Sequence, residues 1–323
     1  MKVNRNMRNP LRPPRGAALL MALFIAAIAT LIVSGLFWRQ FVLVRTIENQ
    51  QLMSQSRLLL QGALDWARSI LREDAAHSSY TALTEPWAQP LAETRLDQLG
   101  ESSALASQAS MSGSIQDAQA RLNLRNLVRS DGSPDEAQHA VLARLVAELR
   151  LPEPTADLIA LYMAQAVTPL AVFNPAAPPP SSRNQPLPPV FPEDVGRIPG
   201  LDPAAGARLA PYVVMLDQRT PVNFNTAPAE VIAAEIEGLS LSDARALVAD
   251  RDRVPFRNTG DVRNALRGRG SSFSDTDVSV SSSYFFVRGE IKLQRADTRM
   301  EALVRRSAIG QLGSVDVVWE REL

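Results

Sequence analysis

Cysteine is absent from the 323 residues, and histidine occurs only twice, at His77 and His139. The lack of thiols excludes disulfide frameworks, cysteine-type zinc sites, thiol catalysis and iron–sulfur clusters. Two histidines cannot build a histidine-rich metal centre. Net charge is missing as well, since 34 basic residues balance 34 acidic ones. With 46% hydrophobic and 21% charged residues, the chain has the composition of a globular protein.

Catalytic and nucleotide-binding motifs are also missing. The sequence contains no G-x-S-x-G, H-E-x-x-H, P-loop or dinucleotide glycine pattern. The two histidines fit solvated or capping side chains. We therefore expect a protein that is not an enzyme and has no small-molecule substrate.

Charged residues do not occur between Arg15 and Arg39. The stretch from Ala17 to Trp38 is long enough to cross a bilayer, because a helix of this length spans about 33 Å. It is too long for the apolar region of a cleaved secretory signal peptide. Basic residues precede it, which predicts a single-pass protein with a cytoplasmic N-terminus and a translocated soluble domain. These residues are Lys2, Arg5, Arg8, Arg12 and Arg15.

The basic segment ends in Pro13-Pro14-Arg15-Gly16, directly before the apolar run. This junction resembles the leader of type IV pilins and type II secretion pseudopilins, which implies cleavage between Gly16 and Ala17 by a prepilin peptidase and methylation of Ala17. An uncleaved signal anchor is the alternative. Cleavage would remove five positive charges and leave a net charge of about −5, which disfavours non-specific binding to nucleic acid.

The sequence favours one helix from Ala17 to about Asp74, since no proline occurs from Arg39 to Asp74. Two short strands are predicted around Asp117-Ala118-Gln119, and two helices over 135–149 and 154–166. Residues 169–192 contain nine prolines and should form an extended surface loop. Further strands are expected near 278–280, 284–291, 300–304 and 315–319. Early and late strands would share one sheet, which makes the helical block an insertion.

Two glycine turns, at Gly200 and Gly238, each precede a helix opened by an acidic or serine residue. They resemble helix-hairpin-helix motifs, in which the turn binds DNA phosphate. Acidic side chains beside the turns would repel phosphate, so a packing role is favoured over DNA binding.

Asp275 and Asp277 lie two residues apart in a predicted loop, with Asn258 and Asp261 as flanking candidates. Oxygen ligands on a loop suit Ca²⁺, although such carboxylates are also often simply solvated. Asp275, Asp277 and Asp261 are therefore candidate calcium ligands.

Five segments stand out along the chain: the leader, GSIQDAQARLNLRNL (113–127), PVNFNTA (221–227), PFRN (255–258) and SYF (283–285). Nearly end to end and in the same order, they resemble the GspK family, the large minor pseudopilins of type II secretion. The resemblance implies an α+β, pilin-like fold, with a long N-terminal helix packed on an antiparallel sheet and a large α-helical insertion. The corresponding segments are a leader (1–16), a transmembrane helix (17–38), the rest of the helix with the first strands (39–130), the insertion (131–265) and the C-terminal strands (266–323).

The resemblance also implies a non-enzymatic subunit at the tip of the type II secretion pseudopilus. Such a subunit initiates assembly and limits length during protein export across the outer membrane. The implied location is the inner membrane, with the soluble domain in the periplasm. The implied partners are the I-class and J-class minor pseudopilins and the prepilin peptidase, with Ca²⁺ as a bound ion. Other pilins carry Glu at mature position five, which here is Met21. The competing hypotheses are a type IV pilus or DNA-uptake pilin that binds DNA, and an unprocessed periplasmic scaffold.

Overall fold

The computed structural model describes residues 15–99, 106–167, 186–266, 268–269, 273–307 and 313–323. The chain forms two compact units, Met1–Ser56 and Arg57–Leu323. Helix α1 (Arg15–His77) begins in the first unit and continues into the second. The predicted helix, 17 to about 74, is thus confirmed to within three residues at each end.

The first unit consists of the N-terminal part of α1, whose apolar side chains are exposed from Ala18 to Val44. Thr30 donates its hydroxyl hydrogen to the carbonyl oxygen of Ala26 at 2.8 Å. The bond satisfies the Thr30 hydroxyl within the helix, so that this polar group is compatible with a lipid environment. The helix contains an 18-residue window of mean hydropathy 2.6, none of it buried. It is therefore a candidate membrane span.

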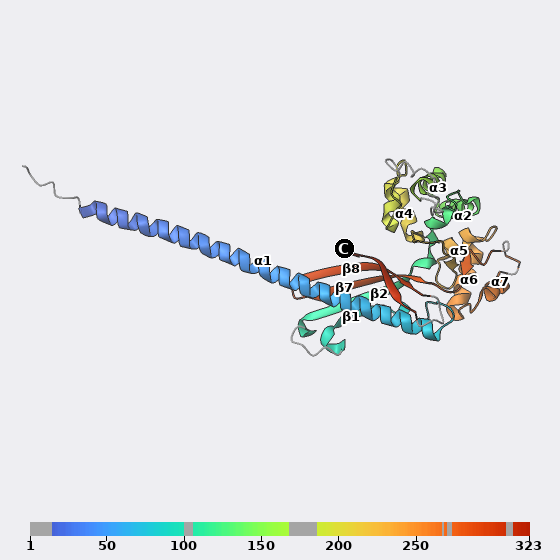
Figure 1. Ribbon diagram of the computed structural model, residues 1–323, viewed down its shortest axis with the longest axis horizontal. Helices are drawn as coiled ribbons and strands as arrows, with labels where there is room; N and C mark the ends of the chain where they lie inside the picture. The colour runs from blue at the N-terminus through green and yellow to red at the C-terminus, as the bar shows by residue number, and fades with distance from the viewer. Residues whose placement is uncertain (1–14, 100–105, 168–185, 267, 270–272, 308–312) are drawn as a thin grey trace, which may run out of the picture. The chain divides into compact units, whose positions relative to one another are not determined.

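The second unit is built on a five-stranded sheet with the order β1-β2-β7-β8-β9, in which all neighbours are antiparallel (Figure 1). The pairing of β2 with β7 runs from Ala109 opposite Leu293 to Asp117 opposite Phe285. Early and late strands therefore share one sheet, and the expected α+β, pilin-like fold is confirmed. The strands are β1 (Leu91–Arg95), β2 (Ala109–Asp117), β7 (Tyr284–Leu293), β8 (Ala296–Arg306) and β9 (Val315–Glu322).

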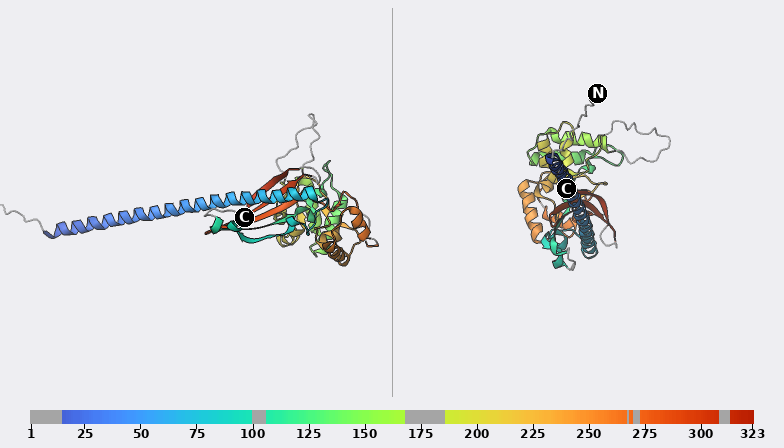
Figure 2. Two further views of the ribbon diagram at one scale, coloured as in Figure 1. Left: turned by 90° about the horizontal axis from the view of Figure 1, so that it is seen from below. Right: turned by 90° about the vertical axis from the view of Figure 1, so that its left-hand side faces the viewer.

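The last turns of α1 lie along one face of this sheet (Figure 2). Leu60, Leu64, Ala67 and Leu71 are buried there at helical spacing. A Cβ atom at Gly289 of β7 would come within 3.3 Å of Leu60 Cδ2, so a side chain there would crowd the helix where it approaches the sheet.

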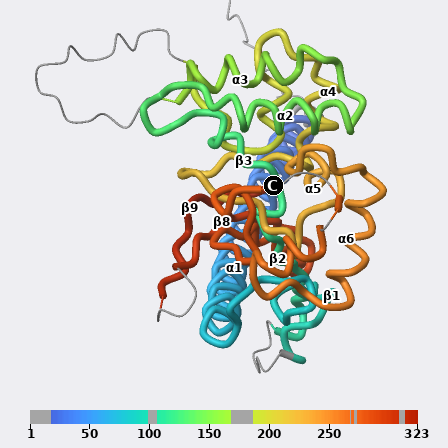
Figure 3. The backbone as a smooth tube through the Cα atoms, turned by 90° about the vertical axis from the view of Figure 1, so that its right-hand side faces the viewer, coloured from blue at the N-terminus to red at the C-terminus, as the bar shows by residue number. Residues whose placement is uncertain are grey.

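The residues between β2 and β7, 118–283, form the helical insertion. Its core joins buried residues of all six of its described α-helices. Figure 3 shows α2 near α3 and α5 near α6, and α2 contacts both α3 and α5. The helices are α2 (Glu136–Glu148), α3 (Pro154–Ala166), α4 (Pro203–Leu209), α5 (Ala229–Glu235), α6 (Leu241–Arg253) and α7 (Thr259–Ala265).

Two short parallel ladders join distant parts of the insertion. Strand β3 (Leu122–Asn123) pairs with β4 (Val213–Val214), and β5 (Val222–Asn223) pairs with β6 (Val278–Ser279). The two strands expected around Asp117 therefore both form, but they belong to different sheets. The insertion is also wider than the expected range 131–265. Most of the proline-rich stretch, 168–185, lies outside the described residues.

Candidate functional site

Arg306, at the end of β8, anchors α1 to the sheet. Its guanidinium donates hydrogen bonds to Asp74 Oδ2 at 2.6 Å, to Thr81 Oγ1 at 2.6 Å and to the carbonyl oxygens of Ser282 and Leu71 at 3.0 and 3.3 Å. The side chains of Arg306 and Asp74 are 1% and 6% exposed. Burial raises the pKa of Asp74 above its ordinary value, although Arg306 acts in the opposite direction.

Asp117, at the end of β2, ties the sheet to the insertion. Its Oδ2 accepts hydrogen bonds from Ser282 Oγ at 2.6 Å, Thr226 Oγ1 at 2.6 Å and Asn223 Nδ2 at 2.9 Å. Its Oδ1 accepts from the backbone N–H of Gln119 at 2.8 Å. Burial raises the pKa of Asp117, against the effect of these donors.

The asparagines of the insertion hold backbone groups that have no ladder partner. Asn225 donates to the carbonyl oxygen of Phe256 at 2.8 Å and accepts from its N–H at 2.9 Å. Asn126 makes the same two-way contact with the backbone of Thr220, at 2.8 and 3.1 Å. Asn123 donates to the carbonyl oxygen of Gln218 at 2.8 Å. In the connecting loops, these side chains supply the hydrogen bonds that backbone groups would otherwise make in helices or strands.

Glu301 of β8 lies between two arginines on the face of the sheet away from α1. It accepts hydrogen bonds from Arg288 at 2.7 Å and from Arg321 at 3.0 Å. Burial acts to raise the pKa of Glu301, but the two arginines outweigh it and hold the pKa below its ordinary value. Arg321 also lies over the Phe191 ring, 4.0 Å from its centroid, and pairs with Glu193 at 3.3 Å. The insertion is thus fixed to both faces of the sheet.

Most of the insertion falls within matched family segments, whereas the strands of the five-stranded sheet lie outside them. Models of the family described as "Type II secretion system (T2SS), protein K" match residues 120–218 and 222–281. Type II secretion system protein K of Pseudomonas aeruginosa is 28% identical over 324 residues, which covers 95% of this chain and 92% of that protein. The chain belongs to the type II secretion protein K family.

The fold of a protein K is also known from a crystal structure. A chain in the GspK–GspI–GspJ complex of enterotoxigenic Escherichia coli superimposes with a TM-score of 0.63. The identity is 21%, and the match covers 85% of this chain and 98% of that one. The protein is accordingly a minor pseudopilin, a structural component of the type II secretion system.

The processing residues expected of a protein K lie at the start of α1. The helix includes Gly16 and Ala17, while residues 1–14 are outside the described range. Met21 is 71% exposed on the apolar part of the helix. Cleavage between Gly16 and Ala17 stays a prediction.

The three candidate calcium ligands have separate surroundings. Asp275 forms an exposed ion pair with Arg263 at 2.5 Å. Asp261 lies in the first turn of α7, which Asn258 caps, and accepts from the backbone N–H of Arg257 at 2.9 Å. Asp275 and Asp277 lie in the expected loop before β6. Within the described ranges, no three His, Asp or Glu side chains are grouped to hold a metal ion.

Asp277 instead belongs to a half-buried group with Gln138 and Glu235. Gln138 Nε2 donates to Asp277 Oδ1 at 3.1 Å. Gln138 Oε1 and Glu235 Oε2 are buried and have no hydrogen-bond partner in the part of the chain that the structure describes. Burial, with repulsion from Asp277, raises the pKa of Glu235 to about 8. These are the hard oxygen atoms that Ca²⁺ takes as ligands.

The two glycine turns serve packing. Gly200 and Gly238 have φ of +85° and +76°, as left-handed turns between helices require. Their apolar neighbours are buried in the core of the insertion, and Leu158 packs 3.7 Å from the position of a Cβ at Gly200. Sequence reasoning missed the contacts of Asp117 and Arg306, because their partners are distant in the chain. The one indication in the sequence that these two residues are buried and paired was their position inside otherwise apolar segments.

Proposed function

We propose that this minor pseudopilin forms the tip of the type II secretion pseudopilus, where it initiates assembly and limits length during protein export across the outer membrane. The observation that carries the proposal is the position of the helical insertion. It lies at the end of the sheet near the last turn of α1, and its helices α6 and α7 extend past that turn (Figure 1). In a filament of parallel helices, that end faces the position of the subunit ahead. A block of this size there would obstruct a subunit ahead.

Met21 supports the same position. An N-terminal amine buried among apolar helices needs a counter-charge, because an unpaired buried charge is costly. In pilins that counter-charge is the glutamate at mature position five of the subunit behind. A subunit with Met21 offers none to a subunit ahead. Such a chain suits the one position that has no subunit ahead of it.

Immunogold labelling of pseudopili tests the tip position. An antibody against an epitope of the insertion should label one end of each fibre. Label repeated along the shaft would contradict the proposal. Met21→Glu should leave the label at the end, since the insertion still blocks addition.

The expected partners are minor pseudopilins of the I and J classes. The related GspK of E. coli was crystallised with GspI and GspJ. Co-purification of the full chain with the I-class and J-class pseudopilins of the same secretion system tests this assembly. A chain that binds neither contradicts it.

For processing and topology, we infer that prepilin peptidase cuts between Gly16 and Ala17 in the inner membrane, with the N-terminus cytoplasmic and the folded domain periplasmic. The basic leader and the adjoining apolar helix support this. Mass spectrometry should find a methylated Ala17 at the N-terminus. A mature chain that still begins at Met1 would be decisive against it.

Calcium is proposed to bind at Asp277, with the unpartnered oxygens of Glu235 and Gln138 as further ligands. A bound ion would neutralise the repulsion between the two carboxylates. Chelation should lower the melting temperature of the full chain, because an ion held only by the native state stabilises it by mass action. Asp277→Asn should remove this response, while Asp275→Asn, the matched control, should keep it. Melting that is insensitive to chelator in calcium-loaded protein rules the site out.

A further inference from the structure

Strand β2 is paired along only part of the edge that faces away from β7. Strand β1 pairs with it from Gly113 to Ser110, and β1 begins directly after Pro90, which has no N–H to add to the ladder. Within the described ranges, the backbone of residues 114–116 has hydrogen-bond partners in β7 only. Since every second residue of a strand turns its N–H and C=O to the unpaired side, this stretch can pair with one more strand.

A groove of about 370 Å³ borders this open edge. Besides the open stretch of β2, it is lined by Leu83, Ala88 and Pro90 of the segment before β1 and by Pro211 and Pro228 of the insertion. Proline has no N–H, so these prolines do not compete for the carbonyl groups of β2. Apolar walls beside an unpaired strand edge are typical of a site that binds an extended peptide.

Arg121 also lines the groove, and it is a half-buried cation. Its guanidinium carbon lies over the Phe286 ring, 4.9 Å from the centroid. In the part of the chain that the structure describes, this guanidinium has neither an ion pair nor a hydrogen bond to an acceptor. Burial, with repulsion from Arg288, lowers the pKa of Arg121. Because a desolvated cation without an anion is costly, the groove favours a ligand that brings a carboxylate.

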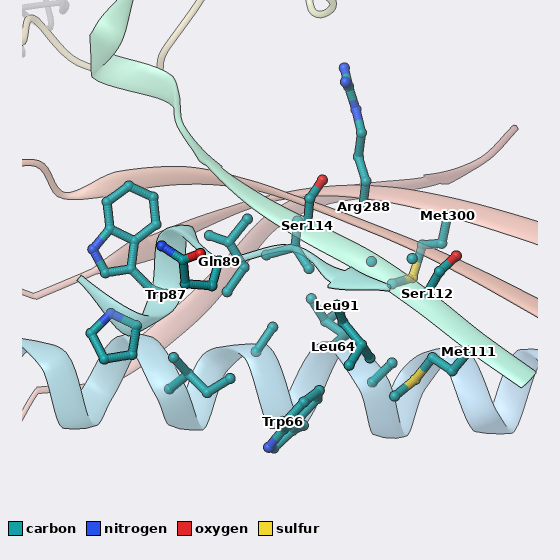
Figure 4. A pocket seen from close by; sticks show the side chains of 18 residues that line it. Leu64, Trp66, Trp87, Gln89, Leu91, Met111, Ser112, Ser114, Arg288 and Met300 are labelled. Atoms are coloured by element: carbon teal, nitrogen blue, oxygen red, sulfur yellow. The ribbon is translucent and has the colours of Figure 1, made fainter. Parts of the chain in front are cut away.

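Arg121 lies on one defined face of the sheet. In Figure 4, which shows the pocket between α1 and the sheet, Ser114 and Arg288 point away from α1. Gln116 and Phe286 are cross-strand partners two residues further on, so their side chains point to the same face. Arg121 stacks on Phe286 and therefore lies on this face too. A strand added at the open edge would place every second side chain on the face that carries Arg121.

We propose that an extended, acidic peptide segment of another protein pairs with residues 114–116 of β2 as an additional strand, with a carboxylate beside Arg121. The open edge selects an extended polypeptide, because only another backbone matches its row of donors and acceptors. Arg121 selects the acidic side chain. The other edge strand, β9, carries Asp316, Glu320 and Glu322 and would repel the same peptide. This binding site is independent of the tip position and of calcium.

The test measures binding of a short fluorescent peptide of alternating glutamate and valine to the full chain in detergent micelles, by fluorescence anisotropy. Arg121→Gln should weaken binding about tenfold through the lost ion pair, and Arg121→Lys, which keeps the charge, should restore most of the affinity. Arg253→Gln, which neutralises an exposed arginine of α6, is the matched control and should bind as wild type. A peptide with glutamine in place of glutamate should bind wild type and Arg121→Gln equally.

Two measurements separate strand addition from simple attraction of charge. The same peptide with N-methyl groups along its backbone keeps its side chains but cannot pair, so it should bind much more weakly. The unmethylated peptide should slow amide hydrogen exchange in residues 114–116. Equal binding of the two peptides, slowed exchange in β9 instead, full binding by Arg121→Gln, or no binding to the wild-type chain would each overturn the proposal.

Discussion

Replacing Arg306 with methionine should lower the free energy of unfolding by about 3 to 5 kcal/mol, because it leaves the buried carboxylate of Asp74 without its counter-charge. The Asp74 side chain is only 6% exposed. Thr81 Oγ1 and the carbonyl oxygens of Leu71 and Ser282 lose a donor as well. The cost should therefore lie toward the upper end of this range.

Two further variants test the reasoning. Arg306→Met with Asp74→Leu should recover part of the loss, since burial already disfavours ionised Asp74 and an apolar pair of similar volume is nearly neutral. Arg57→Met is the matched control, because the ion pair of Arg57 with Glu322 also joins α1 to the sheet but is exposed. It should change stability little.

The assay is urea unfolding of the full chain in detergent micelles, followed by tryptophan fluorescence. Trp87 is 1% exposed and packs edge-on against Phe285 at 5.2 Å, so it reports on the anchored face. A loss below about 1 kcal/mol for Arg306→Met, no larger than that expected of an exposed pair, would refute the buried anchor.

Three other changes have definite expected outcomes. Glu301→Gln should lower the free energy of unfolding at neutral pH. The difference from wild type should disappear as pH falls below about 4, because a carboxyl with a lowered pKa contributes stability only while it is ionised. Equal differences at pH 3 and pH 7 in urea titrations would contradict this. Gly289→Val should cost about 1 to 3 kcal/mol in the same assay through overlap with Leu60, and a neutral effect would mean that α1 shifts freely. Gly238→Ala should cost about 1 kcal/mol from its positive φ alone, and an unchanged unfolding midpoint would argue against the left-handed turn.

Local pattern predicted the long elements well. The proline-free run predicted α1. The alternation of side chains, with β-branched and aromatic residues, predicted β7 to β9. It failed where a short element depends on a single cap. Asn258 accepts from the backbone N–H of Asp261 and starts α7, a helix that the sequence did not indicate as a separate element. Strand β1 was also missed, because LAETR follows Pro90 and has charges on an edge strand.

The junction between sheet and insertion could not be predicted from local pattern. Asp117 and Asn223 are 106 residues apart, and Arg306 and Asp74 are 232 apart. Spacing along a chain does not encode such contacts. The resemblance marked these segments as belonging to the family, but it did not say that their polar residues bond to one another. The Asp277 group shows the same limit, since Gln138 and Glu235 come from α2 and α5.

Because β2 and β7 are adjacent and antiparallel, the chain leaves and re-enters the sheet at nearly the same point. Asp117 faces Phe285 across the two strands, a separation that a tight hairpin turn can bridge. In topological terms the whole of 118–283 is a removable loop, and without it the remaining strands would read as an ordinary meander. Val214 and Leu216 of the insertion cover Phe286 and Leu303 on the face of the sheet away from α1. A protein without the insertion would therefore expose these apolar side chains to solvent.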